Sequence, residues 1–595
     1  MSYNWQIQTA PDASVREYMR ELNTSRILAS ALIRNKVSIE MAGMIFDPDN
    51  YDGIFDSLSI QNIQEAAALL KEYLEKPNAM IQVFADYDTD GITSATIACK
   101  GLQQIVANVY QGRNIEIGYY IPERKDGYGL SVDYAKALVE KANNAYADRE
   151  ILVVTVDNGI TAKPAVDILQ AQPNIRVLVT DHHLPDYENN LTPDKDCICV
   201  DPQTGSQETG KFLAGCGVIF NVLQALESLY GLKHHPATVS LYYLAAIGTI
   251  GDMMNMDLYN ACLVQAGLGQ LNREDTLPWV NWLKDKAGIP RFTTKDIAFT
   301  VSPMINACGQ MGKASLAFDL LVSEKPDEML ELVSEVYKVY QTNKNETKDI
   351  REQAEIDILT NYVPKHPFVM YPLRTDHPGL ASKVATHLAK QVPAPIILWA
   401  ETEENAEEEI IAGSARNDTS LPVLPILREA VKEGLVNSAE GHAYAFGIKL
   451  YRSKLPQLQE FLDKKVRSYG HDIGADMSKK LVVDCVITTD EINVKNMRDI
   501  ERFPFAKNLA APVVMIQGAR ICKAKASKNN PKNICYTIQS PGTIYPIDIW
   551  AWNIKPDEYD PNTHTKIDMV GTIERNFMKP DYATLSVIDL RTYAE

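Results

Sequence analysis

Residues Met80-Ile81-Gln82-Val83-Phe84-Ala85 and the following Asp86-Tyr87-Asp88-Thr89-Asp90-Gly91 decide the fold. The first half is an apolar, β-prone run, and the second half carries three carboxylates at alternate positions. In an open α/β sheet, functional side chains gather in the loops at the carboxyl ends of the strands. We therefore predict a buried strand, a loop of carboxylate ligands for hard divalent cations, and a helix that opens at Thr93.

Two more loops repeat this arrangement. The apolar run of residues 151–156 ends at Asp157, and the run of residues 175–180 ends at Asp181-His182-His183. A further acid, Asp252, follows an apolar helix-like stretch. Carboxylates and histidines from separate strand ends can surround two divalent cations, with Asp181 available to orient a histidine ring. A two-metal hydrolase is therefore the leading hypothesis.

Each of these loops also has a simpler interpretation. The first is compatible with a solvated acidic turn or a calcium loop, although an EF-hand needs a glutamate at the twelfth position, where this chain has Ile97. Taken alone, Asp157 fits a helix cap and Asp252 fits a helix end. The first loop alone already favours a metal site, because an apolar strand precedes it, and the other loops add to this hypothesis.

Composition indicates a globular chain of several domains. A length of 595 residues exceeds what one hydrophobic core supports. The apolar runs are shorter than the roughly 20 residues that a membrane span needs, and the N-terminus lacks a secretion-signal pattern. Nine cysteines without a CxxC pair indicate reduced thiols, so we expect a cytoplasmic protein and no membrane partner.

Charge is distributed unevenly along the chain. The net charge is −18, yet residues 475–595 carry 16 Lys and Arg against 15 Asp and Glu. This part includes a basic stretch that contains no acid, formed by Arg520, Lys523, Lys525, Lys528 and Lys532. The stretch is either the solvated loop of a hairpin or a surface that follows a phosphate backbone.

The secondary-structure pattern divides the chain into five parts. Residues 1–55 form a helical extension, and strand–helix alternation over residues 56–313 predicts a parallel sheet covered on both faces. Residues 314–362 form a charged connecting helix, and residues 363–474 form a smaller α/β domain. Five short strands within residues 475–595 fit an OB-like β-barrel. Trp550 and Trp552 share one face of a predicted strand, either in the core or as a surface for stacking bases.

The order of these motifs resembles the DHH phosphoesterase superfamily. Further segments resemble its RecJ branch, and together they cover about residues 50–595: Ile305-Asn306-Ala307-Cys308-Gly309, Gly413-Ser414-Ala415-Arg416-Asn417 and Glu440-Gly441-His442. The resemblance implies an α/β protein with a DHH catalytic domain, a long linking helix, a DHH-associated phosphate-binding domain and an OB-like nucleic-acid-binding domain.

The resemblance also implies a 5′→3′ exonuclease that degrades single-stranded DNA in repair, recombination or replication, with two Mn²⁺ or Mg²⁺ ions. One metal would be held by Asp86 and Asp88, and the other by Asp90, His182 and Asp252. Asp157 would bridge both. Within this set, catalysis would rest on Asp88, Asp90 and Asp157, together with His183 and Arg416.

Substrate contacts follow from the same resemblance. His183 would contact the scissile phosphate, and a second phosphate would be held by Ser414, Arg416 and His442. The remaining candidate substrate contacts are Arg124, Asn306, Arg520, Lys523 and Lys525. A single-strand-binding protein or a helicase is a candidate partner, and we expect a monomer. The resemblance also implies that the cytoplasm is that of a bacterial or phage-infected cell.

Two departures from the family pattern leave the end preference open. Where relatives carry Pro-Arg-x-Asn-Ala-x-Gly-Arg-Met, this chain has Met304 and Gln310 in place of the two arginines. Two alternatives therefore stay open. One is a DHH phosphodiesterase for short oligonucleotides or cyclic dinucleotides, which usually lacks the barrel. The other is a non-catalytic replication scaffold, which typically loses metal ligands.

Overall fold

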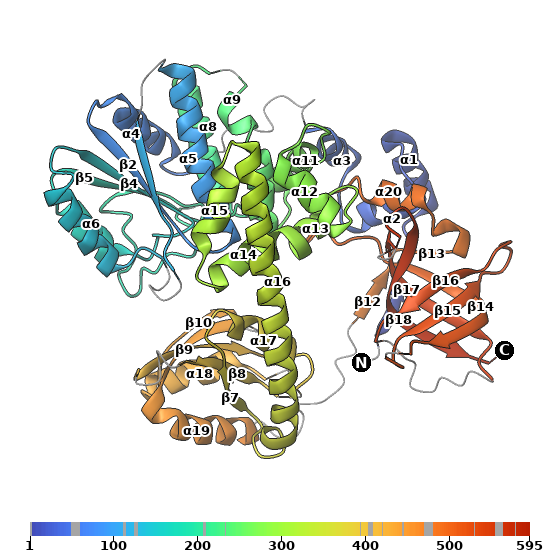
Figure 1. Cartoon of the computed structure of the whole chain (residues 1–595). Coiled ribbons are helices and arrows are strands. Elements are labelled where there is room, and N and C mark those ends of the chain that lie inside the picture. Colours follow the sequence, from blue (N-terminus) through green and yellow to red (C-terminus); the bar gives the residue numbers. More distant parts are fainter. Residues whose placement is uncertain are drawn as a thin grey trace.

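The computed structural model describes residues 3–48, 60–110, 115–123, 129–205, 210–232, 234–392, 394–402, 408–418, 421–442, 445–468, 480–528, 530–553, 563–576 and 579–594. A helix-covered sheet, a smaller sheet domain at the end of a long helix, and a β-barrel beside them are visible in Figure 1.

The first part is built on a five-stranded, all-parallel sheet, as predicted. Its strand order is β3-β2-β4-β5-β6, with bounds β2 Ala79–Ala85, β3 Glu116–Tyr120, β4 Glu150–Val156, β5 Ile175–Thr180 and β6 Ile198–Val200. Burial on both faces explains the largely apolar sequences of β2 and β4, whose polar residues Gln82 and Thr155 are also buried. One face packs against α4 (Ile63–Glu75), α5 (Thr89–Val109) and α8 (Gly215–Leu229), and the other against α6 (Val132–Asn144) and α7 (Lys163–Gln170).

A layer of helices follows the sheet. It comprises α9 (Pro236–Val239), α10 (Tyr242–Gly251), α11 (Leu258–Leu271), α12 (Pro278–Ala287), α13 (Thr294–Asp296), α14 (Ser302–Gln310) and α15 (Ala314–Val322). The expected connecting helix is in fact two helices, because Pro326 starts a new one, α16 (Pro326–Asp357). The 32-residue α16 extends from this layer to the smaller domain (Figure 1).

The smaller domain has a mixed sheet in the order β10-β11-β9-β8-β7. The bounds are β7 Val369–Arg374, β8 Ile396–Glu401, β9 Ile410–Arg416, β10 Val436–His442 and β11 Ala445–Tyr451. Helix α17 (Leu380–Leu388) packs on one face, and α18 (Val423–Lys432) and α19 (Leu455–Ser468) pack on the other. The hairpin of β10 and β11 was absent from the sequence prediction.

The C-terminal part is the predicted barrel-like sheet, in the order β16-β15-β14-β17-β18 with β13 paired to β14. The bounds are β13 Cys485–Ile487, β14 Val514–Ala526, β15 Ile534–Gln539, β16 Ile547–Ala551, β17 Lys566–Arg575 and β18 Ala583–Tyr593; the helix α20 spans Val494–Ile500. The sequence prediction lacked β18. A register shift near Gly571 disturbs its pairing with β17, and only Leu585 and Leu590 of β18 are buried.

The N-terminal extension contains the expected helices, α1 (Asp12–Leu22), α2 (Arg26–Arg34) and α3 (Ile39–Phe46). It also contains a strand, β1 (Asn4–Ile7), which pairs in parallel with β12 (Lys480–Val483). Helix α2 contributes Ile27 to the barrel core and Leu28 to the core of the first sheet. The extension therefore joins the barrel to the first part of the chain.

Candidate metal centre and substrate contacts

The first carboxylate loop lies at the carboxyl end of β2. Asp86 is buried directly after the strand. Asp88 caps α5 by accepting a hydrogen bond from the Gly91 backbone N–H, at 3.0 Å. This cap starts the helix at Thr89, not at the expected Thr93, because the Asp88 carboxylate satisfies an unpaired N–H of the first turn. Asp90 consequently lies inside that turn.

The buried Asp90 carboxylate lies between two helix N-termini. It accepts backbone hydrogen bonds from Gly215 (2.6 Å) and Cys216 (3.0 Å), the first residues of α8, while lying in the first turn of α5. The partial positive charges of both helix starts favour a negative charge at this position. The fold therefore fixes the orientation of Asp90.

Asp157 follows β4 and has a left-handed backbone, with φ of 61°. This conformation is uncommon outside glycine, although aspartate and asparagine tolerate it better than most residues. The start of α8 lies so close that a Cβ atom on Gly215 would be 2.5 Å from the Asp157 Cβ. The carboxylate is buried, and its Oδ1 accepts no hydrogen bond from the described residues. A buried oxygen of this kind is suited to a metal ion.

The two histidines after β5 have different surroundings. His182 Nε2 lies 3.1 Å from Asp157 Oδ1, 3.7 Å from Asp252 Oδ2 and 3.8 Å from Asp90 Oδ2. His183 Nδ1 lies 2.7 Å from Asp181 Oδ1, so Asp181 orients the His183 ring. His182 therefore faces the carboxylate cluster, and His183 flanks it.

The potential ligand atoms form overlapping groups, each within 4.8 Å. One group is Asp86, Asp88 and Asp157; another is Asp90, His182 and Asp252; a third is Asp157, His182 and His183. The first two groups contain the residues that the resemblance assigns to the two metals. Asp157 belongs to the first group and also contacts His182 of the second.

The electrostatics of this cluster favour divalent cations. Burial, together with Asp90 and Asp88, raises the pKa of Asp252 to about 8 and raises the pKa of Asp157 well above its usual range. Burial lowers the pKa of His182, so its imidazole is neutral and able to bind a metal. A cation would relieve the repulsion among these carboxylates, so the donor set fits Mn²⁺ or Mg²⁺.

Unlike His182, His183 favours its protonated form. Burial alone would lower its pKa, but the hydrogen bond to Asp181 and the charge of that carboxylate raise the pKa of His183 to about 9. The ring is therefore a cation at neutral pH, which suits contact with a phosphate oxygen.

Helix α14 supports the carboxylate loop. Asn306 Oδ1 accepts a hydrogen bond from the Thr89 backbone N–H, at 2.9 Å, so this side chain holds the loop, and its contact with substrate stays a prediction. Met304 is only 1% exposed and belongs to the core. A Cβ atom on Gly309 would lie 2.3 Å from the Tyr87 carbonyl oxygen, so α14 packs directly against the loop at Gly309.

Arg416 and Ser414 lie together on β9. The Arg416 guanidinium donates to Ser414 Oγ (2.9 Å), Ser382 Oγ (2.8 Å) and Thr386 Oγ1 (2.9 Å). No carboxylate among the described residues pairs with it, and burial lowers the pKa of Arg416. The predictions for Arg124 and for the His442 side chain fall outside the described residues.

Lys383 on α17 is a residue that the sequence analysis missed, because a single lysine within a helix belongs to no motif. Its Nζ donates to Asn343 Oδ1 at 2.8 Å, and Asn343 Nδ2 donates to Gln310 Oε1 at 3.1 Å. Burial lowers the pKa of Lys383 to about 8. Two half-buried cations, Lys383 and Arg416, therefore lie on adjacent elements of the smaller domain.

Asp201 was also missed, although the rule that identified the other carboxylates applies to it. It directly follows β6 and is buried, and burial together with Asp181 raises the pKa of Asp201 to about 8. The apolar residues Ile198-Cys199-Val200 directly before it are visible in the sequence, so the sequence already carried this signal.

On the barrel, basic side chains and two tryptophans lie on neighbouring strands. Lys525 of β14 is opposite Cys535 of β15, which is opposite Trp550 of β16. The rings of Trp550 and Trp552 stack with centroids 5.0 Å apart, and Trp552 is 56% exposed. The pair therefore lies at the surface and not in the core. The other predicted contacts on β14 are Arg520 and Lys523.

Two family patterns match the chain. The DHH family, N-terminal domain, matches residues 80–249, which contain the parallel sheet and the candidate ligands of its loops. The RecJ OB domain matches residues 483–586, which contain most of the barrel. The chain is similar to RecJ proteins of the DHH family. Among relatives of this RecJ-like chain, the single-stranded-DNA-specific exonuclease RecJ of Bacillus subtilis is 25% identical over 539 residues, which is 90% of this chain and 64% of that protein.

Solved structures share the RecJ-like fold. The crystal structure of RecJ in complex with Mn²⁺ from Thermus thermophilus covers 99% of this chain and 79% of that one, with a TM-score of 0.76 and 22% identity. A crystal structure of exonuclease RecJ bound to manganese covers 72% of this chain and 100% of that one, with a TM-score of 0.56 and 26% identity. Among the described helices of the RecJ-like chain, none is long and apolar enough to cross a membrane.

Proposed function

We propose that this RecJ-like protein hydrolyses phosphodiester bonds of single-stranded DNA as a metal-dependent 5′→3′ exonuclease. The observation that carries the proposal is the pair of ligand groups that meet at Asp157. The substrate class is supported by relatives from Bacillus subtilis and Thermus thermophilus, which are named single-stranded-DNA-specific exonucleases. Repair, recombination and replication are the processes in which such an activity serves.

Two divalent cations at these groups would supply an activated water molecule and stabilise the charge that develops on the scissile phosphate. The chain's own contribution is a rigid set of donors. Asp86, Asp88 and Asp157 would hold one cation, and Asp90, His182 and Asp252 would hold the other. Asp157 lies close enough to His182 to contribute to the second site as well. Buried helix starts and strand ends hold these carboxylates in position before substrate arrives.

Positive side chains would then hold the phosphates. His183, protonated at neutral pH and oriented by Asp181, would donate to an oxygen of the scissile phosphate. Arg416 presents a planar fork that suits phosphate, and Ser414 and Ser382 already orient it. Further contacts in this proposal are Arg124, Asn306 and His442.

The barrel would bind the single strand. Basic side chains on β14 can contact phosphates, and the exposed Trp550–Trp552 pair can stack with bases, a combination typical of single-strand binding. We include a single-strand-binding protein or a helicase as candidate partners, and a monomer as the functional unit.

The direct test is a digestion with purified protein and Mn²⁺. A long single strand labelled at its 5′ end should release labelled mononucleotides from the start of the reaction, because an exonuclease that begins at the 5′ end removes the label first. Product size against time, on a sequencing gel, measures this. A 3′-labelled strand serves as the control and should shorten gradually.

Two outcomes would overturn the proposal. Hydrolysis restricted to oligonucleotides of a few residues or to cyclic dinucleotides would favour the other DHH phosphodiesterases. Tight binding of the strand without hydrolysis in Mn²⁺ or Mg²⁺ would favour a replication scaffold.

We further propose that Lys383 and Arg416 bind the terminal 5′-phosphate in this chain. The family pattern places an arginine at position 310, and the neutral Gln310 found here is linked through Asn343 to Lys383. No carboxylate among the described residues pairs with Lys383, and a half-buried, uncompensated cation favours an anionic ligand.

The Lys383→Met variant should raise KM on 5′-phosphorylated strands about tenfold or more, since a hydrogen bond to a charged group contributes about 1.5–3 kcal/mol. Strands with a 5′-hydroxyl should be hydrolysed nearly as before. Adding Gln310→Arg to Lys383→Met should restore part of the preference. Lys390→Met, an exposed lysine just beyond the same helix, is the matched control. Equal losses on both strands would refute the assignment.

A further inference from the structure

Thr89 stands between potential ligands of two different groups in the metal centre. The preceding Asp88 belongs to one group, and the following Asp90 belongs to the other. The Thr89 side chain is only 1% exposed. A buried hydroxyl costs free energy unless it is hydrogen-bonded, so its partners show what this side chain does.

Helix α14 binds both the side chain and the backbone of Thr89. The Thr89 hydroxyl donates to the backbone carbonyl of Ser302 at 3.1 Å, and the Ser302 hydroxyl lies 3.2 Å from the Thr89 hydroxyl oxygen. One turn later, Asn306 accepts a hydrogen bond from the Thr89 backbone N–H at 2.9 Å, and its own amide donates to the Ser302 hydroxyl at 3.4 Å. Ser302 is buried, so this hydrogen-bonded cluster is sheltered from water.

The same pair of side chains contacts α10, the helix that ends before the ligand Asp252. A Cβ atom on Gly251, the last residue of α10, would lie 2.7 Å from Thr89 Cγ2 and 3.1 Å from Ser302 Oγ. Only a residue without a side chain allows this close approach. Asp252 directly follows Gly251. The position of this ligand relative to Asp90 therefore depends on how α10 packs on the Thr89–Ser302 pair.

Asp252 has little else to hold it in place. Among the described residues, no hydrogen-bond donor reaches its carboxylate, and the charged partner found near it is His182 Nε2, 3.7 Å away. Asp90 differs, because its carboxylate accepts two backbone hydrogen bonds from the start of α8. The location of Asp252 is therefore set by the backbone that carries it, and so by the contact of α10 with Thr89 and Ser302.

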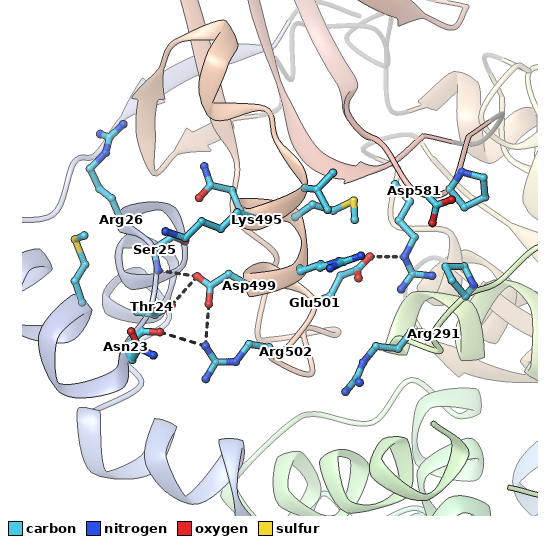
Figure 2. Close-up of a pocket in the computed structure, with 18 residues that line it drawn as sticks. Asn23, Thr24, Ser25, Arg26, Arg291, Lys495, Asp499, Glu501, Arg502 and Asp581 are labelled. Atoms are coloured by element: carbon cyan, nitrogen blue, oxygen red, sulfur yellow. Dashed lines mark hydrogen bonds and ion pairs between the residues drawn. The ribbon is translucent and has the colours of Figure 1, made fainter. Parts of the chain in front are cut away.

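The helix that carries Ser302 is anchored at its other end by the barrel. Helix α13, the π-helical turn Ile297–Val301 and α14 follow one another without a break. Glu501, labelled in Figure 2, pairs with Arg575 of β17 at 2.6 Å, and Arg575 lies 3.7 Å from Asp296 of α13. A helix fixed at its start offers Ser302 as a rigid support for the metal centre.

We propose that Thr89 and Ser302 are positioning residues that hold the two ligand groups at the separation that a pair of cations requires. Neither side chain binds a metal. Thr89 joins the carboxylate loop to α14 and to the end of α10, so one hydrogen-bonded contact aligns Asp88 and Asp90 with Asp252. This assignment rests on the proposed two-metal exonuclease function and adds the residues that align its two sites.

The test measures Mn²⁺ binding to variants of the full chain by electron paramagnetic resonance. Free Mn²⁺ gives a strong signal that is lost on binding, and two neighbouring ions give a spin-coupled signal. Thr89→Val removes the hydroxyl and keeps the branched shape, Thr89→Ser keeps the hydroxyl, and Ser302→Ala removes the second hydroxyl. Thr96→Val is the matched control, because Thr96 is a buried threonine of the same helix whose hydroxyl donates to the Ile92 carbonyl, at 2.8 Å.

The wild type, Thr96→Val and Thr89→Ser should bind two Mn²⁺ ions with a spin-coupled signal. Thr89→Val should bind one ion as the wild type does and the other about 10- to 100-fold more weakly, the usual effect of removing a residue that supports metal ligands. Ser302→Ala should have a smaller effect, because the Thr89 hydroxyl keeps its bond to the backbone carbonyl of residue 302. The double variant Thr89→Val/Ser302→Ala should be no weaker than Thr89→Val, since both side chains act through one contact.

Melting temperatures in EDTA distinguish positioning from a general loss of stability, because Thr89→Val and Thr96→Val each remove one buried hydroxyl. Wild-type Mn²⁺ binding by Thr89→Val, or an equal loss of binding in Thr96→Val, would refute the positioning role and leave the proposed function intact. If Thr89→Val does not fold, Ser302→Ala decides, and unchanged affinity for both ions in that variant would refute the role. A wild type that binds fewer than two ions would instead refute the two-metal function.

Discussion

Asp157→Asn is expected to reduce strand hydrolysis by at least ~10³-fold while the protein keeps its fold. Asp157 belongs to the ligand group of Asp86 and Asp88, and its Oδ1 lies 3.1 Å from Nε2 of His182 in the other group. An uncharged amide binds two cations poorly, and a loss of ~4 kcal/mol in transition-state stabilisation corresponds to ~10³ in rate. Asparagine is the suitable replacement because it tolerates the left-handed backbone at this position, where φ is 61°.

The melting temperature of the variant distinguishes the loss of a metal ligand from unfolding of the protein. In EDTA, Asp157→Asn should melt at the wild-type temperature or above it, because the variant removes a buried charge that Asp90 and Asp88 repel. Thermal unfolding followed by circular dichroism measures this, and Asp133→Asn, on the exposed side of α6, is the control. A near-normal rate in the variant would contradict the assignment of Asp157, and a large drop in melting temperature would leave the activity loss explained by misfolding.

Removal of metal is expected to abolish activity completely, and Mn²⁺ should bind more tightly as the pH rises toward about 8. The pKa of Asp252 is raised to about 8 by burial and by its neighbours Asp90 and Asp88. Below that pH the carboxyl is protonated, so an incoming cation must displace the proton. Each such displaced proton weakens apparent affinity up to about tenfold per pH unit.

Isothermal titration calorimetry in two buffers of different ionisation enthalpy measures both the affinity and the proton release. The titration should show protons released on Mn²⁺ binding below about pH 8. Affinity that is independent of pH, without proton release, would mean that the cations bind elsewhere. Activity that survives exhaustive chelation would contradict the metal-dependent mechanism itself.

The parallel sheet and its carboxylate loops could be predicted because the signal is local. A strand buried on both faces, such as β2 or β4, appears as a largely apolar run, and the acid that follows it marks the loop. The same reasoning places Asp86, Asp157 and Asp181 at one edge of the sheet. Which carboxylates share a cation is a matter of three-dimensional proximity, and the family resemblance supplied that division.

Other elements depend on contacts that no local pattern contains. The strand β1 exists through its pairing with β12, whose residues lie near position 480. The start of α5 at Thr89 depends on the Asp88 cap. Asn306, on the distant helix α14, also accepts a hydrogen bond from the Thr89 backbone N–H. Lys383 becomes a candidate contact only because the smaller domain brings it to Asn343 and Gln310. The five domain boundaries stay predictions.

The most direct test of the central claim is anomalous diffraction from crystals grown with Mn²⁺. We expect two manganese peaks about 3.5–4 Å apart, with the Asp157 carboxylate between them. The remaining ligands should divide into Asp86 with Asp88 and Asp90 with His182 and Asp252. A single peak, or two peaks that Asp157 does not bridge, would contradict it.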